Sequence, residues 1–560
     1  MEPLADRDCS TIVSMWRART QEGGDRTAMQ VRRDGKYQPV TWSEMARDVR
    51  RTATALVALG VAPGDRVVLL SKNRYEWIVC DLAIQMAHAV HVPIHASFAG
   101  PQISYQILDS GAKLVILSGP DQAQKLVDEA AKFPRALRFV SLDPCPPPIG
   151  AFLVQHLSDL VAKVDDTKAA QLEKNARDKV TPDGLATILY TSGTTGDPKG
   201  VMLSQRNIAS NTSAMLSMVA QKDGDVRLTW LPLSHIFART CDLYTWIAAG
   251  GVLALAESPE SIVANCQEIH PTLINGVPYF WDKLERFLVS QNLADKPGAL
   301  AGMLGGRARI CCSGGAALPD HTAHFFDKQG VFLFQGYGLT ETSPTITTCR
   351  ENEVKLGTVG KPMPGIEIKI ADDGEILTRG PHVMVGYWNK PEATAEVIRD
   401  GWFHTGDLGE LDDEGYLKIT GRKKEMIVTA AGKNISPVNL EALLTGDPLI
   451  AQAFIIGDAR NYVSALVVVN PEPLKAELAE REIPLKSIHD ALTDPQVREI
   501  YAAHIAQRLA GVSHYEQVQK FTLLEKGFSA ESGEMTLTLK LRRKVIEKNY
   551  AEVIEAMYGR

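Results

Sequence analysis

The chain has 560 residues, of which 45% are hydrophobic and 23% are charged, and its formal net charge is −7. The length predicts several domains, the composition is typical of a globular enzyme, and the acidic balance argues against a nucleic-acid-binding protein. The 8 cysteines show neither a disulfide framework nor the CxxC spacing of a zinc site, which predicts a reducing, cytoplasmic setting.

The first 180 residues alternate short apolar runs with amphipathic segments. The segment 41–60 has the apolar periodicity of a helix, with Thr41 as its N-cap. Buried strands are predicted at 65–71, 89–95, 113–119 and 137–142. Alternating strands and helices predict a parallel or mixed α/β sheet.

The stretch YTSGTTGDPKG, residues 190–200, follows an apolar run and precedes a segment, 201–215, that we interpret as the opening of a helix. A loop between a strand and a helix N-terminus is a common phosphate site. Gly193 and Gly196 permit close approach of the backbone to a ligand. Hydroxyl groups and a positive charge are supplied by Thr191, Ser192, Thr194, Thr195 and Lys199. The loop lacks the Walker A pattern, so a phosphate cradle and a flexible surface turn both remain open from composition alone.

Three later strands, within 272–278, 308–315 and 332–338, each run into a glycine-bearing loop. Such loops place backbone N–H groups at the carboxyl edge of a sheet, where α/β proteins bind ligands. Residues 365–380 follow with the pattern of a hairpin.

The pattern changes after about residue 424. A helix is predicted to begin at Pro437 with Ser436 as its cap, and a strand–turn–strand follows at 451–470. Two helical segments and a basic end complete the chain. These features predict a separate, smaller α+β domain.

Six motifs accompany the 190–200 loop in a fixed order. They are LPLSHIF (231–237), SGGAALP (313–319), QGYGLTETSP (335–344), GWFHTGDLG (401–409), GRKKEMI (421–427) and TLTLKLRR (536–543). In these motifs the chain resembles the adenylate-forming (AMP-binding) superfamily over nearly its whole length. Within it, NRYEWIVCDLA (73–83), LPLSHIFAR and TLTLK most resemble the long-chain fatty acid–CoA ligases. The chain departs from their TPTLK at Leu537, which puts fine specificity in question.

The resemblance implies an α/β fold with two domains. Residues 1–423 are expected to form a large adenylation domain of several subdomains, with α/β sheets and a distorted β-barrel part. Residues 424–560 are expected to form a small, mobile α+β domain that rotates about a hinge at Lys424.

The resemblance also implies a reaction in two steps. A fatty acid attacks ATP to give acyl-AMP and pyrophosphate, and CoA then displaces AMP to give acyl-CoA. The alternatives are a fatty acyl-AMP ligase that passes the acyl group to a carrier protein, or a nucleotide-binding module without turnover. The substrates are therefore ATP, a fatty acid and CoA, with Mg²⁺ as the expected counter-ion of the phosphates.

The resemblance assigns most nucleotide contacts to the first domain. Glu341 is expected to bind the metal, with help from Thr191, and Asp407 to accept hydrogen bonds from the ribose with Arg422 as its partner. Tyr337 is expected to stack on adenine. Further ATP contacts are expected from the 191–196 loop with Lys199, and from Gly314, Gly315, Ala316, Gln335, Gly336, Gly338 and Thr340.

The remaining roles divide between acyl binding and the small domain. By resemblance, Lys540 lies between the attacking carboxylate and the α-phosphate and is catalytic together with Glu341 and Thr191. Gly432 and Lys433 are expected on the CoA side. The fatty-acid site is expected at His235, Val277, Pro278 and Gly338, where a small Gly338 could leave room for the chain.

The sequence says little about partners beyond these small molecules. No apolar stretch has the length of a membrane span, and the N-terminus lacks a signal-peptide pattern. We expect a cytoplasmic protein that binds no nucleic acid. Peripheral contact with the inner membrane, and the choice between monomer and homodimer, are left open.

Overall fold

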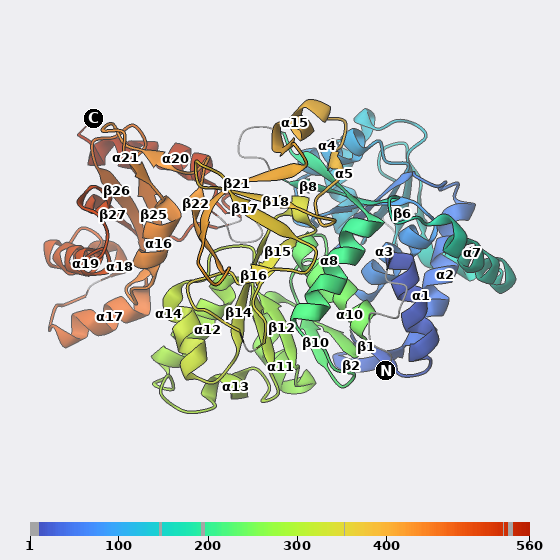
Figure 1. Cartoon of the computed structure of the whole chain (residues 1–560), viewed down its shortest axis with the longest axis horizontal. Coiled ribbons are helices and arrows are strands. Elements are labelled where there is room, and N and C mark those ends of the chain that lie inside the picture. The colour runs from blue at the N-terminus through green and yellow to red at the C-terminus, as the bar shows by residue number, and fades with distance from the viewer. Residues whose placement is uncertain are drawn as a thin grey trace.

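The structure is a computed structural model of the chain. It describes residues 10–144, 148–191, 197–351, 353–485, 487–529, 531–535 and 541–559. Figure 1 shows a large body built by about the N-terminal three quarters of the chain and a smaller body, coloured orange to red, at one end of it. None of the described helices combines the length and the apolar sequence that crossing a bilayer requires.

The first sheet contains the predicted N-terminal strands. In spatial order it consists of β19 (Gly386–Tyr387), β9 (Lys199–Ser204), β8 (Leu185–Thr191), β4 (Val90–Ile94), β3 (Arg66–Leu70), β5 (Leu114–Leu117), β6 (Arg138–Ser141) and β7 (Val154–His156). Strands β4, β3, β5 and β6 are parallel and almost wholly buried, as the apolar runs predicted. The predicted cap is confirmed: Thr41 Oγ1 accepts a hydrogen bond from Glu44 N–H, and Glu44 accepts one from Thr41 N–H.

The second sheet carries the three glycine-bearing loops. Its order is β16 (Lys361–Pro362), β15 (Thr345–Thr348), β14 (Leu333–Gly338), β13 (Ile310–Ser313), β12 (Leu273–Gly276), β10 (Val226–Thr229), β11 (Val252–Leu255), β1 (Thr27–Arg33) and β2 (Lys36–Thr41). Strands β10, β12, β13 and β14 are parallel. Their carboxyl ends therefore meet at one edge, as the sequence predicted.

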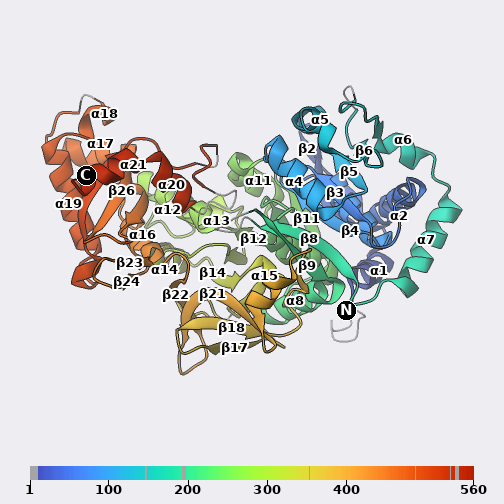
Figure 2. The same ribbon diagram turned by 90° about the horizontal axis from the view of Figure 1, so that it is seen from above.

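A third sheet of the large body is antiparallel. It contains β17 (Glu367–Ile370), β18 (Glu375–Arg379), β21 (Trp402–Leu411) and β20 (Ile398–Arg399), and β22 (Leu417–Arg422) pairs with β21. The predicted hairpin at 365–380 is confirmed as β17 and β18. Seen from above in Figure 2, β17 and β18 project at one side of the large body.

The helices of the large body pack on these sheets. Their bounds are α1 (Ile12–Gly23), α2 (Trp42–Ala58), α3 (Tyr75–Met86), α4 (Gly100–Ser110), α5 (Pro120–Val127), α6 (Leu157–Ala162), α7 (Asp166–Lys179), α8 (Gln205–Met218), α9 (Ile236–Ala238), α10 (Thr245–Ala249), α11 (Ile262–Ile269), α12 (Pro278–Ser290), α13 (Ala299–Met303), α14 (Asp320–Lys328) and α15 (Pro391–Val397). A π-helix, Arg239–Tyr244, joins α9 to α10.

The helix expected to open directly after the 190–200 loop begins later than predicted. Residues Lys199–Ser204 form β9, which pairs antiparallel with β8, and α8 begins only at Gln205 with Ser204 as its cap. Val201 and Leu203 are fully buried, so this apolar run extends the sheet. The loop therefore joins two strands, and the argument from a helix N-terminus does not apply to it.

A buried charged network fixes the π-helix to the first sheet. The guanidinium of Arg239, which is 0% exposed, lies 2.5 Å from Asp81 Oδ1 and donates to Thr187 Oγ1 at 2.8 Å. Thr187 lies on β8, the strand that leads into the 190–200 loop. The network thus links the segment after LPLSHIF to the loop strand through the core.

The small body has its own sheet and core. β25 (Ile450–Ile456), β26 (Val463–Val469) and β27 (Val518–Leu524) form the sheet, and β23 (Ile427–Val428) pairs with β24 (Asn434–Ile435). Its helices are α16 (Pro437–Thr445), α17 (Pro471–Glu480), α18 (Ile488–Ala491), α19 (Pro495–Arg508), α20 (Arg543–Asn549) and α21 (Ala551–Met557). Strand β27 was missed, because its partly exposed edge sequence lacks a continuous apolar run.

Arg286 of α12 joins the two bodies. It donates to the carbonyl oxygens of Thr445, at 2.6 Å, and of Ile450, at 3.1 Å, and its Nε donates to Asp282 at 2.7 Å. Thr445 is the last residue of α16, whose terminal carbonyls attract a positive charge. Any rotation of the small body must break these two contacts.

His382 should make the stability of the large body sensitive to acid. Burial lowers the pKa of His382 from 6.5 to about 4, and its side chain is almost fully enclosed. Between these values the unfolded state binds a proton that the folded state does not, so stability is lost as pH falls. Relative to His382→Gln, the wild type should lose about 2.5 kcal/mol between pH 7 and pH 4.5.

Urea unfolding of both proteins at these two pH values measures this change. His324→Gln, at an exposed position, is the control and should follow the wild type at both values. A stability difference between wild type and His382→Gln that stays constant with pH would contradict the prediction.

Candidate active site

Side chains from all three sheets of the large body lie near the carboxyl edge of the second sheet. The register pairs Gly276 with Ser313, and Ser313 with Gln335, so the loops after β12, β13 and β14 start side by side. The side-chain carbonyl oxygen of Gln335, on β14, accepts a hydrogen bond from Leu318 N–H at 3.3 Å. This bond joins the loop after β13 to β14. This is the arrangement in which α/β proteins hold ligands.

The loop after β13 packs closely against the LPLSHIF segment. A Cβ added to Gly314 would lie 2.9 Å from Phe237 Cζ, so only glycine fits there without movement. Gly315 and Ala316 follow at half-buried and exposed positions, respectively. Their backbone is therefore accessible at the edge where an adenine ring was expected.

Asp407 lies at the centre of a hydrogen-bonded group. Its Oδ2 accepts from Tyr337 Oη at 2.8 Å, and its Oδ1 accepts from Arg422 Nε at 2.7 Å. Antiparallel pairing of β21 with β22 puts Asp407 directly opposite Arg422. The structure thus brings together three residues that the sequence assigned to nucleotide binding.

The charges in this group stabilise one another. Burial acts to lower the pKa of Arg422, but the negative charges of Asp407 and then Glu425 act in the opposite direction, and the pKa lies above its usual value. Burial, followed by the negative charge of Asp407, raises the pKa of Tyr337 well above its usual range. Tyr337 is therefore a neutral donor that orients the carboxylate.

A second group surrounds Glu341, on the short turn Thr340–Thr342. Glu341 Oε1 accepts from Tyr387 Oη at 2.8 Å, and Lys199 Nζ lies 5.0 Å from the centroid of the Tyr387 ring. Lys199 in turn pairs with Thr191 across β8 and β9. A carboxylate, an ammonium group and a hydroxyl therefore lie at neighbouring positions. Ser192, Gly193, Thr194, Thr195 and Gly196 lie outside the described residues.

Tyr387 and Phe237 were not singled out from the sequence. Tyr387 is 46 positions from Glu341, and it stands in no motif that would connect them. Burial, and then the Glu341 charge, raises the pKa of Tyr387 well above its usual range, so its hydroxyl is a donor. Phe237 ends the LPLSHIF motif, but the motif assigned no role to it, and the order of the motifs gave no signal for Tyr387.

The residues expected at the fatty-acid site have differing environments. His235 caps α9, and its Nδ1 accepts from Phe237 N–H at 3.2 Å. Val277 and Pro278 are buried at the start of α12. A Cβ on Gly338 would lie 1.7 Å from the Pro344 carbonyl oxygen. The absence of a side chain at Gly338 is therefore required by the turn into β15, and the Pro344 backbone fills the space that a side chain would take.

The expected residues of the small body are exposed. Gly432 lies at the turn between β23 and β24, and a Cβ there would meet nothing within 4 Å. Lys433 Nζ lies 5.5 Å from the Tyr515 ring centroid. Lys424 is exposed just after β22, and Lys540 lies outside the described residues.

Sequence comparisons match the two bodies to known families. Residues 16–388 match the family described as AMP-binding enzyme, and residues 424–560 match the AMP-binding enzyme C-terminal domain. The chain is 35% identical to the Mycobacterium bovis protein named long-chain-fatty-acid–CoA ligase FadD15, over 94% of this chain and 93% of that protein. It is 28% identical to Bos taurus long-chain-fatty-acid–CoA ligase ACSBG1, over 100% of this chain and 86% of that protein.

Solved structures share the fold. The anthranilate CoA ligase AuaEII, in complex with anthranoyl-AMP, has a TM-score of 0.78 at 19% identity, covering 96% of this chain and 97% of its own. ATP-bound MatB from Rhodopseudomonas palustris has a TM-score of 0.75 at 25% identity, covering 97% and 99%. The expected fold class, a large α/β domain with a smaller C-terminal domain, is confirmed.

Proposed function

The chain belongs to the AMP-binding enzyme family, and from this premise we propose that it is a long-chain fatty acid–CoA ligase that forms AMP. The identity to FadD15 over nearly the whole of both chains supports the acyl and CoA specificity. The single observation that supports the chemistry is the pair of hydrogen bonds from Tyr337 to Asp407 and from Tyr387 to Glu341, because Tyr337 lies on β14 and Glu341 follows that strand directly.

In the first step the fatty carboxylate attacks the α-phosphorus of ATP and pyrophosphate leaves. The carboxylate is already ionised at neutral pH, so no general base is needed. We assign ribose binding to Asp407, held by Tyr337 and Arg422, and contact with the phosphates to Lys199 and the 191–196 loop. The reaction then depends on positioning and on neutralising phosphate charge.

Glu341 and Thr191 would hold a magnesium ion. Both offer hard oxygen ligands, which suit this ion, and a carboxylate that already accepts one hydrogen bond from Tyr387 keeps lone pairs free. When bound, the ion supplies positive charge to the phosphates. Lys540 would add a second positive charge at the α-phosphate.

In the second step the CoA thiol attacks the acyl carbonyl carbon, AMP leaves, and the thiol proton is released. Gly432 and Lys433 are exposed on the small body. We propose that residues 424–560 rotate about Lys424 to bring them to the acyl-AMP, which requires release of the Arg286 contacts to Thr445 and Ile450. We also propose that the protein is cytoplasmic, as a monomer or a homodimer.

Fatty-acid-dependent pyrophosphate release, with and without CoA, tests the function across acids from acetate to oleate. Multiple turnovers that need CoA and favour long chains would support the ligase. Acyl-AMP that accumulates and is not cleared by CoA would indicate transfer to a carrier protein instead. No release with any acid would leave a nucleotide-binding module.

Tyr337→Phe should raise the KM for ATP roughly tenfold and leave kcat within about threefold. The change removes one hydrogen bond to a charged acceptor, which is worth about 1.5 kcal/mol, and keeps the ring. Steady-state kinetics at varied ATP measures it. Tyr462→Phe is the matched control, since Tyr462 Oη donates to a backbone carbonyl in the small body. Equal KM values in the two variants would contradict the role of Tyr337.

A further inference from the structure

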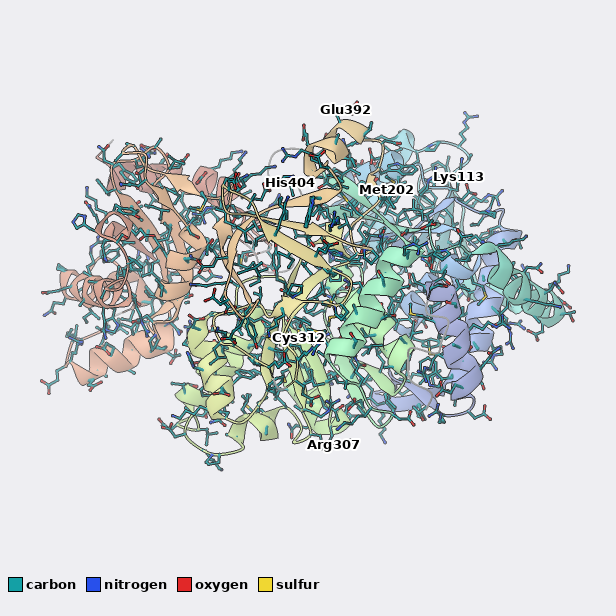
Figure 3. The ribbon with its side chains drawn as sticks, in the orientation of Figure 1. Lys113, Met202, Arg307, Cys312, Glu392 and His404 are labelled. Carbon is teal, nitrogen blue, oxygen red and sulfur yellow. The ribbon has the colours of Figure 1, made fainter. Side chains whose placement is uncertain are left out.

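A small internal cavity lies behind the loops of the candidate site. Its volume is about 20 Å³, about the room needed by one water molecule. It is lined by Met215, Val219, Gln221, Arg227, Cys241, Leu273, Asn275, Ile310, Cys312 and Phe334. Figure 3 labels Cys312, which lies in the interior among the strands of the second sheet. We call the space enclosed by these residues the inner pocket.

The inner pocket is lined by residues of the same strands that carry the candidate site. Asn275 precedes Gly276 and Val277, Cys312 precedes Ser313 and Gly314, and Phe334 precedes Gln335. Phe237, which contacts the Gly314 position, also packs against the apolar cluster that contains Met215 and Cys312. A chain attached to a carboxylate at the loops would therefore enter the pocket from the carboxyl end of the strands.

The side walls of the pocket are apolar and adaptable. Met215 has an unbranched side chain that fills irregular gaps and changes conformation readily. Leu273, Ile310 and Phe334 are buried hydrophobic side chains on neighbouring strands. Because the cavity holds about 20 Å³, an acyl chain enters only when such side chains move aside.

The end of the pocket beside β10 is charged and rigid. Arg227 Nη1 donates to Asp242 Oδ1 at 2.9 Å, and Asn275 Nδ2 donates to the same oxygen at 2.8 Å. The side chains of Arg227 and Asp242 are 4% and 1% exposed. The Cα of Arg227 is in register with Leu273 at the start of β12, and its guanidinium meets Asp242 at the level of Asn275, two residues further along that strand.

An apolar chain cannot displace this end. Separating a buried ion pair leaves uncompensated charge, which is strongly unfavourable. Arg227 Nε and Asp242 Oδ2 already lack a hydrogen-bond partner among the described residues, and a methyl group would give them none. The soft walls can yield to methylene groups, whereas the ion pair cannot.

We propose that the Arg227–Asp242 pair, held by Asn275, closes the acyl pocket and sets the longest acyl chain that the enzyme activates. This inference rests on the proposed function. It assigns to the two charged residues a specificity role, with no part in the chemical steps.

The test is the chain-length profile of kcat/KM for the wild type and for Arg227→Met combined with Asp242→Asn. Both charges are removed together, so neither remains unpaired, and Asn keeps an acceptor for Asn275. Each buried methylene group adds roughly fourfold to kcat/KM. We expect the limit to move to longer acids, with at least a roughly tenfold gain for the first acids beyond the wild-type limit and an unchanged KM for ATP.

The matched control is Arg309→Met combined with Asp225→Asn. This pair, at 2.7 Å, joins the amino ends of the same strands and does not line the pocket. Its profile should coincide with the wild type. If the first double variant does not fold, Arg227→Gln combined with Asp242→Asn is measured in its place, with the same expected direction.

The outcomes separate this inference from the proposed function. An active wild type whose profile is unchanged by the Arg227 and Asp242 substitutions overturns the inference alone. A wild type that activates no fatty acid overturns the proposed function. A shift of equal size in the control pair shows a general effect on the sheet and also overturns the inference.

Discussion

Replacing Glu341 by Gln should lower the rate of acyl-AMP formation by roughly 10²–10³-fold. The substitution keeps an oxygen that can accept the hydrogen bond from Tyr387 Oη and keeps the size of the side chain. What it removes is one negative charge at the expected magnesium position, beside Lys199 and Thr191. The loss should therefore appear in the chemistry, with folding little changed.

Pyrophosphate release at saturating ATP and fatty acid measures the rate, and a magnesium titration should show a higher midpoint in the variant. Glu392→Gln is the control: Figure 3 labels Glu392 on α15, and its side chain is exposed. An unchanged rate and magnesium midpoint in Glu341→Gln would remove this residue from the site.

The meeting of the glycine loops could be predicted from sequence because parallel strands order their ends. Once three apolar runs each end in glycine, a parallel sheet must bring Gly314 and Gln335 to one edge. The pairing of Asp407 with Arg422 was inferred by resemblance, and the register of β21 and β22 supplies its physical basis. Short-range patterns succeed where the geometry of a strand fixes the outcome.

Contacts between distant segments could not be predicted in this way. Tyr387 reaches Glu341 only because β19 pairs with β9, and a two-residue edge strand leaves no periodic signal. Gly338 was interpreted as room for an acyl chain, but its neighbour is the Pro344 backbone, a contact set by the turn. The sequence indicated that a small residue is needed at position 338, but the reason for it is a tertiary contact with the Pro344 backbone.

The start of α8 shows the same limit on a smaller scale. The apolar run that contains Val201 and Leu203 is too short for its periodicity to separate a helix from a strand, and pairing with β8 decides between them. A short apolar run beside a loop is ambiguous by periodicity alone. The consequence is structural, because β8 and β9 flank the loop and the argument from a helix N-terminus does not apply to it.

Lys540→Ala should reduce acyl-AMP formation roughly 10²–10³-fold while conversion of supplied acyl-AMP and CoA to acyl-CoA falls less than about threefold. By resemblance, the lysine follows the charge that develops between the carboxylate and the α-phosphate. The second step has no such charge at that position. Pyrophosphate release reports the first step, and AMP release from added acyl-AMP reports the second.

Lys544→Ala separates this role from a general effect of positive charge. Lys544 belongs to the same basic segment and is exposed on α20, whose first residue, Arg543, is fixed by an ion pair with Glu441 at 2.6 Å. Because that anchor is intact in both variants, the segment should keep its place on the small body. If Lys544→Ala slowed acyl-AMP formation as much as Lys540→Ala does, Lys540 would have no specific role beyond its positive charge. If Lys540→Ala slowed both steps equally, both steps would use the same position of the small domain. That result would contradict the proposed rotation about Lys424.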